Sequence, residues 1–184
     1  KRQGTGGHVF PGYNLATHLM QKKYNVKLVS DKRGYKYLKE YKGLNISILP
    51  SSPLIKKNLF KLFFSVVLIF FSVLRCLIFL IYHKPSIIFG MGGYSSFPIC
   101  IAASILRIKF VIYENNLILG KANKFLLPFA SKILVSYKEL EGIPNKYHYK
   151  IFAIGNIIKK EIINYPKQMN NKLENRKINI LILG

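Results

Sequence analysis

The stretch from Gly4 to Gly12 reads GTGGHVFPG, and the rest of the chain is organised around it. Its closely spaced glycines allow a sharp turn and let backbone N–H groups approach a ligand. Pro11 suits the first turn of a helix, and the apolar residues after it recur at helical spacing. A glycine loop that leads into a helix favours anions, because unpaired N–H groups and the helix dipole both attract negative charge. The spacing is not that of the dinucleotide motif, so it predicts either a cradle for a phosphate or diphosphate, or a plain tight turn.

A second glycine loop lies in the middle of the chain, where residues 90–94 read GMGGY. It follows a short apolar run at 86–89, which we expect to be a buried strand, and precedes a helix expected over 97–107. Two such loops in one domain indicate a site at the carboxyl ends of parallel strands, where open α/β sheets hold their ligands.

Strand-length apolar runs alternate with helical stretches along most of the chain. The expected strands are 25–30, 45–50, 86–89, 109–113, 132–136 and 149–154, with helices near 97–107 and 119–129. This alternation predicts an α/β fold with a Rossmann-like, doubly wound parallel sheet. Residues 1–163 would form one domain, the polar segment 164–177 a linker, and 178–184 the first strand of a second domain.

The chain of 184 residues is strongly basic, with a formal net charge of +22. Only five of its 29 basic residues are arginine, the residue best suited to bidentate phosphate recognition, and the lysines run evenly along the chain. We interpret the charge first as compositional bias, second as a sign of an anionic partner such as a membrane surface or a diphosphate, and third as a sign of nucleic acid.

The segment 59–82 is unusually apolar, and from Leu62 to Tyr82 its only charged residue is Arg75. It is long enough to cross a bilayer, which takes about 20 residues. A single crossing would place the two glycine loops on opposite sides of the membrane. Association with the membrane surface is therefore favoured over a buried core helix and over a true span. The residues expected to face the membrane are Lys61, Phe64, Leu68, Phe71 and Arg75.

Four motifs in order and at similar spacing carry a family resemblance: GTGGHVFPG, GMGGY, the ENN of residues 114–116 and the GN of residues 155–156. Together they resemble the MurG family of N-acetylglucosaminyltransferases, in glycosyltransferase family 28. The resemblance covers nearly the whole chain. It implies a two-domain GT-B fold in which this chain is the N-terminal, acceptor-binding half and the donor-binding half has barely begun.

The resemblance also implies a reaction. The family transfers N-acetylglucosamine from UDP-GlcNAc to undecaprenyl-diphosphate-N-acetylmuramoyl-pentapeptide (lipid I), which yields lipid II for peptidoglycan synthesis. The expected partners are lipid I, UDP-GlcNAc bound mainly by the C-terminal half, and the anionic cytoplasmic face of the bacterial inner membrane as a peripheral site. Asp31 is the only aspartate, so an Asp-x-Asp metal pair is impossible here and a metal-independent, inverting displacement is the better match. No cofactor and no nucleic-acid partner are expected.

Site residues follow from the same resemblance. His8 is a candidate general base or diphosphate contact, or else only caps its loop through a hydrogen bond. Glu114 ends an apolar run, where an unpaired carboxylate is unfavourable, so we expect either a catalytic task or a structural salt bridge. Tyr94 either borders the acceptor or packs as a loop aromatic. The expected substrate-binding residues are Thr5, Gly6, Gly7, Gly92, Gly93, Tyr94, Asn116 and Lys159.

The chain departs from the family pattern at three places. The family has an apolar strand before the first glycine loop, where only residues 1–3 stand here, so we expect that strand to be missing. Asn115 stands where the family usually has Gln. The family's Gly-Asn-Pro-Val-Arg becomes GNIIK at 155–159, and Lys159 keeps the positive charge without the planar fork of arginine.

Two other functions stay open at this point. The chain could belong to a GT-B transferase for another membrane lipid acceptor, or it could be a non-enzymatic, membrane-tethered binding subunit anchored by 59–82. Under the leading hypothesis the chain alone should not turn over, because the donor-binding half is missing.

Overall fold

The computed structural model describes residues 6–41, 43–51 and 58–158. Four predictions fall outside these residues: the substrate contacts of Thr5 and Lys159, the linker at 164–177 and the strand at 178–184.

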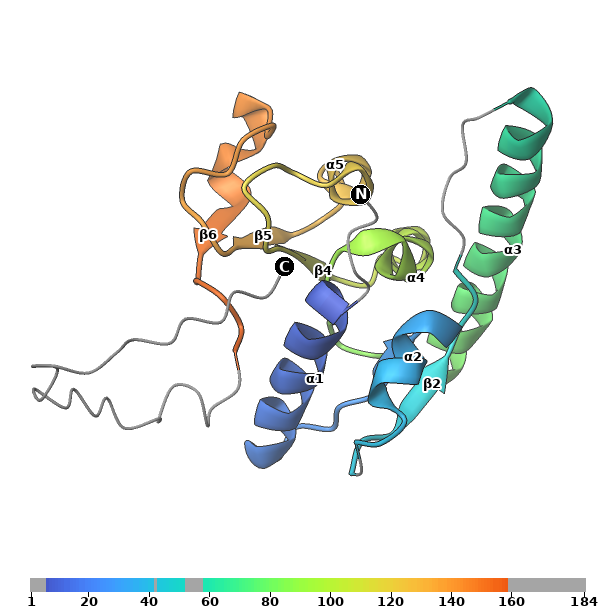
Figure 1. Ribbon diagram of the computed structural model, residues 1–184, viewed down its shortest axis with the longest axis horizontal. Helices are drawn as coiled ribbons and strands as arrows, with labels where there is room; N and C mark the ends of the chain where they lie inside the picture. The colour runs from blue at the N-terminus through green and yellow to red at the C-terminus, as the bar shows by residue number, and fades with distance from the viewer. Residues whose placement is uncertain (1–5, 42, 52–57, 159–184) are drawn as a thin grey trace, which may run out of the picture.

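Helices and parallel strands alternate along the described chain, as the sequence predicts (Figure 1). In order, the elements are α1 (Gly6–Gln21), β1 (Leu28–Ser30), α2 (Lys32–Leu38), β2 (Ile46–Ile48), α3 (Leu59–His83), β3 (Ile88–Gly90), α4 (Gly93–Ile105), β4 (Phe110–Glu114), α5 (Lys121–Leu126), β5 (Lys132–Val135), the 3₁₀ helix η1 (Asn145–Lys150) and β6 (Ile151–Ala153). Each expected strand is present, and α2 is a helix that the sequence analysis did not expect.

The strands form two parallel sheets, one of β1 and β2 and one in the order β3-β4-β5-β6. In a doubly wound fold the first strand of the chain lies in the middle of the sheet. Here its position would be between β1 and β3. In the family that the motifs resemble, this strand precedes the first glycine motif, a position that lies outside the described residues. One edge of β1 and one edge of β3 therefore lack a partner strand among the residues that the structure describes.

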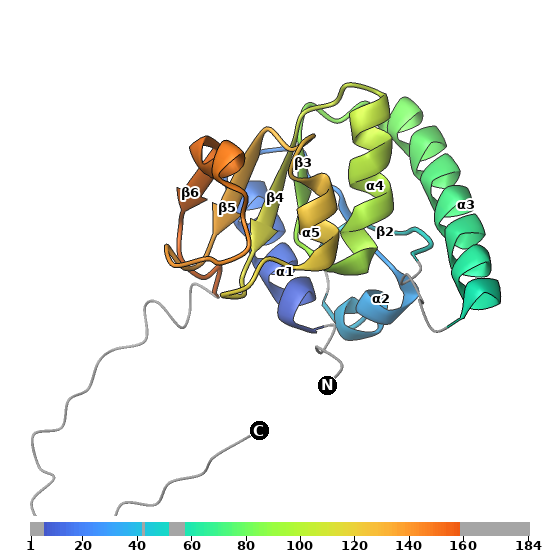
Figure 2. The same ribbon diagram turned by 90° about the horizontal axis from the view of Figure 1, so that it is seen from above.

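The hydrophobic core includes β4, whose five residues are all buried. Ile112 pairs with Gly90 of β3 on one side and with Ile133 of β5 on the other. The helices α4 and α5 lie on one face of the four-stranded sheet and α1 lies on the other, while α3 packs against α4 on the side away from α5 (Figure 2). Because all strands are parallel, their carboxyl ends and the beginnings of the following helices meet at one edge of the sheet.

Two helices begin earlier than predicted. The expectation that Pro11 opens the first helix is wrong, because α1 already begins at Gly6 and Pro11 lies inside it. Likewise α4 begins at Gly93 rather than near Phe97, with Pro98 inside it. A proline in the sixth position of a helix removes one N–H donor, which a helix held by tertiary contacts tolerates. Gly6 and Gly7 are therefore in the first turn of α1 rather than in a preceding loop.

The helix α3 is one continuous element that packs against α4 along a narrow face of Ser65, Ser72, Cys76 and Leu80. Asn58 caps its beginning by accepting the N–H of Lys61. The idea that this segment is ordinary buried core is wrong, because its outer surface is apolar and exposed. That surface consists of Leu59, Phe60, Phe63, Phe64, Val66, Leu68, Phe70, Phe71, Leu74, Ile78, Ile81 and Tyr82.

By length and composition α3 could cross a membrane, and it is the one helix among the described residues that could. The five residues predicted to face a membrane, Lys61, Phe64, Leu68, Phe71 and Arg75, are all exposed on it. Their contact with lipid stays a prediction.

The only aspartate of the chain has a structural role. Asp31 caps α2, where its Oδ1 accepts the N–H of Gly34 at 2.7 Å and its Oδ2 accepts Arg33 and the hydroxyl of Ser51, each at 2.8 Å. Burial raises the pKa of Asp31, but the hydrogen bonds from Gly34, Arg33 and Ser51 outweigh it and hold that pKa below its usual value.

Candidate functional site

The two glycine motifs meet through His8. This residue lies in the first turn of α1, and its Nδ1 is 3.0 Å from the carbonyl oxygen of Met91, just after β3. A carbonyl oxygen can only accept a hydrogen bond, so Nδ1 is the donor. A neutral His8 ring therefore keeps its lone pair on Nε2, the nitrogen that could take up a proton.

Gly92 and Gly93 are glycines because the His8 ring lies against them. A Cβ on Gly92 would be 3.1 Å from Nδ1 of His8, and one on Gly93 would be 3.2 Å from Cδ2. Both residues also have positive φ, +85° and +72°, which L side chains rarely adopt. The second motif is thus a close-packed seat for an imidazole at the beginning of α4.

The helices α1 and α4 both begin at this seat with a glycine. Each presents its first N–H groups and the positive end of its dipole toward the carboxyl edge of the sheet. Tyr94, the second residue of α4, is 38% exposed beside them. The arrangement can bind an anion such as a diphosphate and hold a base next to it.

Glu114 is buried at the end of β4, with 2% of its surface exposed. Its Oε1 accepts the backbone and side-chain N–H groups of Asn116, at 3.2 and 2.6 Å. Its Oε2 accepts the N–H of Gly120 at 2.8 Å and Nδ2 of Asn123 at 3.0 Å. The expected salt bridge is wrong, because among the described residues no cation pairs with this carboxylate.

These four bonds fix the turn that leads from β4 to α5. Asn116 is held at both its backbone and its side chain, while Gly120 is the cap that precedes α5. Since each carboxylate oxygen already accepts two N–H groups, Glu114 stabilises the turn from inside, and the catalytic task predicted for it stays a prediction.

Asn115, between these two residues, points elsewhere. Its Nδ2 donates to the carbonyl oxygen of Gly7 at 3.0 Å, so the turn after β4 is bonded to the first turn of α1. Its Oδ1 is buried without a partner among the described residues. The sequence analysis noted Asn115 only as a departure from the family, since a contact across more than 100 residues leaves no local signal.

Tyr113 was missed for the same reason. It is buried in β4, and its hydroxyl lies 2.7 Å from Oγ of Ser136 and accepts the N–H of Ile157 at 3.2 Å. The same hydroxyl is 3.4 Å from the carbonyl oxygen of Gly155. It therefore holds the Gly155-Asn156 motif against the end of β5. In sequence, Tyr113 is indistinguishable from any other aromatic residue of an apolar strand.

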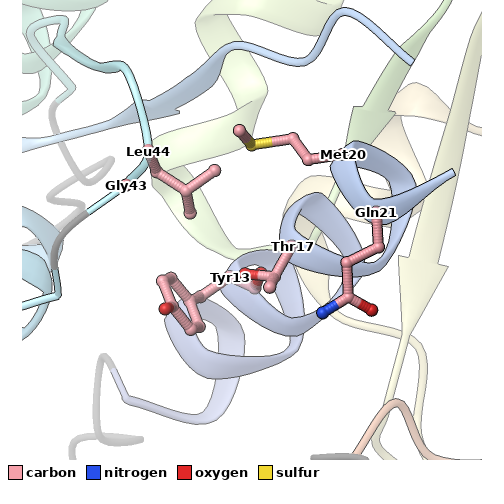
Figure 3. A pocket seen from close by; sticks show the side chains of 6 residues that line it. All are labelled: Tyr13, Thr17, Met20, Gln21, Gly43 and Leu44. Atoms are coloured by element: carbon pink, nitrogen blue, oxygen red, sulfur yellow. The ribbon is translucent and has the colours of Figure 1, made fainter. Parts of the chain in front are cut away.

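A pocket of about 340 Å³ lies elsewhere, between α1 and the segment that precedes β2 (Figure 3). It is lined by Tyr13, Thr17, Met20, Gln21, Gly43 and Leu44, so none of the described predicted site residues contributes to it. The described part of the chain also holds no group of three or more His, Cys, Asp or Glu side chains that could bind a metal ion.

One known protein family matches more than half of this chain. Residues 3–135 match the model of the glycosyltransferase family 28 N-terminal domain. The chain belongs to this family. Among its family 28 relatives, proteins of Rickettsia felis and Pelagibacter ubique are each 34% identical to it and cover 96% and 98% of the chain. Both are named UDP-N-acetylglucosamine--N-acetylmuramyl-(pentapeptide) pyrophosphoryl-undecaprenol N-acetylglucosamine transferase.

The fold agrees with a solved structure. The crystal structure of MurG from Acinetobacter baumannii superimposes with a TM-score of 0.65 over 83% of this chain, at 23% sequence identity. The chain spans about half the length of the curated relatives it matches and 42% of that structure. The predicted GT-B glycosyltransferase fold is confirmed for this family 28 domain.

Within that domain, six of the predicted site residues form two groups. His8, Gly92 and Gly93 are in direct contact, and Gly7 is next to them at the beginning of α1. Glu114 and Asn116 form the second group, in the turn after β4. The bond from Asn115 to Gly7 joins the two groups.

Proposed function

We propose that this chain is the acceptor-binding half of an enzyme that transfers N-acetylglucosamine from UDP-GlcNAc to lipid I. The observation that carries the proposal is the contact between the two glycine motifs. There the Nδ1 of His8 donates a hydrogen bond to Met91, which leaves the lone pair of Nε2 available to accept a proton. The names of the family 28 relatives support the substrates. UDP-GlcNAc would bind mainly in the part of such an enzyme that this chain, at about half the length of the relatives, does not span.

The acceptor's diphosphate would lie at the beginnings of α1 and α4. Both helices are long enough to have a substantial dipole, with 16 and 13 residues, and both begin with glycine, so their N–H groups can approach phosphate oxygens closely. No metal ion is needed for this contact, since backbone N–H groups supply the compensating partial charge.

His8 would act on the acceptor sugar. Nε2 takes the proton of the attacking hydroxyl while its oxygen forms a bond to the anomeric carbon of the donor. The bond from that carbon to the diphosphate of UDP breaks on the opposite face, and UDP leaves with the electron pair. The anomeric configuration is therefore inverted. General-base catalysis of this kind is typically worth about 10²–10⁴ in rate.

The exposed face of α3 would lie on the membrane surface. Both ends of α3 belong to one folded body, and the contact between His8 and Met91 brings together the motifs that precede and follow it in the sequence. A helix that crossed the bilayer would need its ends on opposite sides. Apolar insertion with Lys61 and Arg75 near anionic headgroups therefore fits better, as a peripheral site on the cytoplasmic face of the inner membrane.

The test is UDP release by the full-length product of the gene, supplied with UDP-GlcNAc and with or without a lipid I analogue. We expect release that depends on the analogue. Release that instead depends on another polyprenyl or glycolipid acceptor would replace the proposed substrate. A folded, complete protein that releases no UDP with any of these acceptors would favour a binding subunit without enzymatic activity.

A further inference from the structure

One carbonyl group in the first turn of α1 has lost its helical partner. In an α-helix the carbonyl of Gly7 would accept the N–H of residue 11. That residue is Pro11, which has no N–H. The missing bond lies directly beside His8, in a turn that begins with two adjacent glycines, Gly6 and Gly7, and glycine is the least favourable residue after proline in a helix.

Asn115 supplies the missing donor. Its Nδ2 lies 3.0 Å from the carbonyl oxygen of Gly7. The side-chain amide of Asn115 cannot be flipped, because a flip would place Oδ1 against the carbonyl oxygen of Gly7, which is also an acceptor. The backbone on either side of Asn115 is also fixed, since Glu114 and Asn116 are bonded to each other. A rigid turn at the end of β4 thus replaces a bond that the helix cannot make.

We infer that Asn115 is a positioning residue for His8, an inference that rests on the function proposed above. His8 is held through its ring by Met91 and through its backbone by the bond from Asn115 to Gly7. Without the second contact, the first turn of α1 can open while the ring stays near the glycines. Nε2 then spends less time in line with the acceptor hydroxyl, and misplacement by about 1 Å can reduce a rate about 100-fold.

A double-mutant cycle tests this in the full-length protein. Its four forms are the unchanged protein, Asn115→Ala, Pro11→Ala and the double variant. In Pro11→Ala the helix regains its own N–H donor to Gly7, so Asn115 becomes redundant. Asn115→Gln keeps the amide donor and serves as the conservative rescue. Each form is assayed for kcat, for the KM of both substrates, and for hydrogen–deuterium exchange over residues 6–12.

We expect Asn115→Ala to lower kcat about tenfold and to raise exchange over residues 6–12 by a similar factor, with the KM for UDP-GlcNAc unchanged. With Pro11→Ala already present, the same change should alter kcat and exchange by less than about threefold. Asn115→Gln should keep most of the activity. If Asn115 only stabilised the domain, Asn115→Ala would lower kcat by the same factor in both backgrounds.

Equal effects of Asn115→Ala in both backgrounds, or unchanged exchange over residues 6–12, would overturn the inference. If the unchanged protein releases no UDP, the proposed function fails separately. The exchange measurement then decides the link between Asn115 and α1 by itself, because it does not depend on activity.

Discussion

Replacing Gly92 by alanine should disable the site without removing any functional group. Gly92 has φ +85° and ψ 179°, a conformation almost restricted to glycine. Holding another residue there costs about 1–3 kcal/mol, which corresponds to about a 5- to 150-fold change in an equilibrium. The new Cβ would also be 3.1 Å from Nδ1 and 3.2 Å from Cε1 of His8, so the ring must move by a few tenths of an ångström.

Gly43 provides the matched control. It also has positive φ, +95°, but a Cβ built on it has no neighbour within 4 Å. Both Gly92→Ala and Gly43→Ala should therefore lower the thermal midpoint, by about 2–4 °C for each kcal/mol in a domain of this size. Only Gly92→Ala displaces His8, so only this variant should lose activity, and we expect kcat for UDP release to fall at least about tenfold.

The assay is UDP release by the full-length protein at saturating UDP-GlcNAc and lipid I analogue, with the thermal midpoint measured on the same samples. If Gly92→Ala keeps kcat within twofold of the unchanged protein, the tight seat for His8 has no role in the reaction. If Gly43→Ala loses as much activity as Gly92→Ala, the loss reflects backbone strain alone. Either result would refute the reasoning.

Three further variants test other parts of the structure. Glu114→Gln replaces one accepting oxygen by a donor that faces two N–H groups, so we expect a lower thermal midpoint and reduced kcat, whereas the exposed Glu139→Gln should change neither. The pKa of Asp31 is held below its usual value by hydrogen bonds that outweigh burial, so its stabilising effect is complete above about pH 4 and is lost as the pH falls through the lowered pKa. Asp31→Asn should therefore lower the thermal midpoint near neutral pH and flatten its decline in acid, and an unchanged acid profile would contradict this. Phe64→Glu should reduce co-sedimentation with vesicles that contain anionic lipid. Tyr24 is about as exposed as Phe64 but lies outside α3, so Tyr24→Glu should not reduce it. Equal vesicle binding by the two variants would contradict a membrane-facing surface on α3.

Much of the fold could be predicted because its signals are local. A strand such as β4 is a short apolar run between polar residues, and the alternation of such runs with helices determines the α/β class. The beginning of α1 was misplaced because a proline is usual in the first turn of a helix, and nothing local shows that Pro11 lies deeper. The beginning of α4 was misplaced because its first turn starts within the glycine motif itself, at Gly93. The short helix α2 was missed because its one clear signal is the cap, Asp31.

The site was predicted in its parts but not in its connections. The glycine motifs were found because closely spaced glycines indicate a sharp turn or a close approach of the backbone. The contact of the His8 ring with Gly92 joins distant segments and leaves no such local signal. The carboxylate at position 114 was expected to have either a catalytic task or a salt bridge, and the structure surrounds it with N–H donors instead of a cation. The bonds of Asn115 and Tyr113 are visible only once the chain is folded.

The most direct test of the central claim compares two histidines on one helix. His8 contacts the second glycine motif, while His18 is exposed near the end of α1. In the full-length protein, His8→Ala should reduce kcat for acceptor-dependent UDP release by about 10²–10⁴, and His18→Ala should leave it unchanged. A His8→Ala protein that is folded and keeps kcat within a few-fold of the unchanged enzyme would contradict the assignment of His8 as the base.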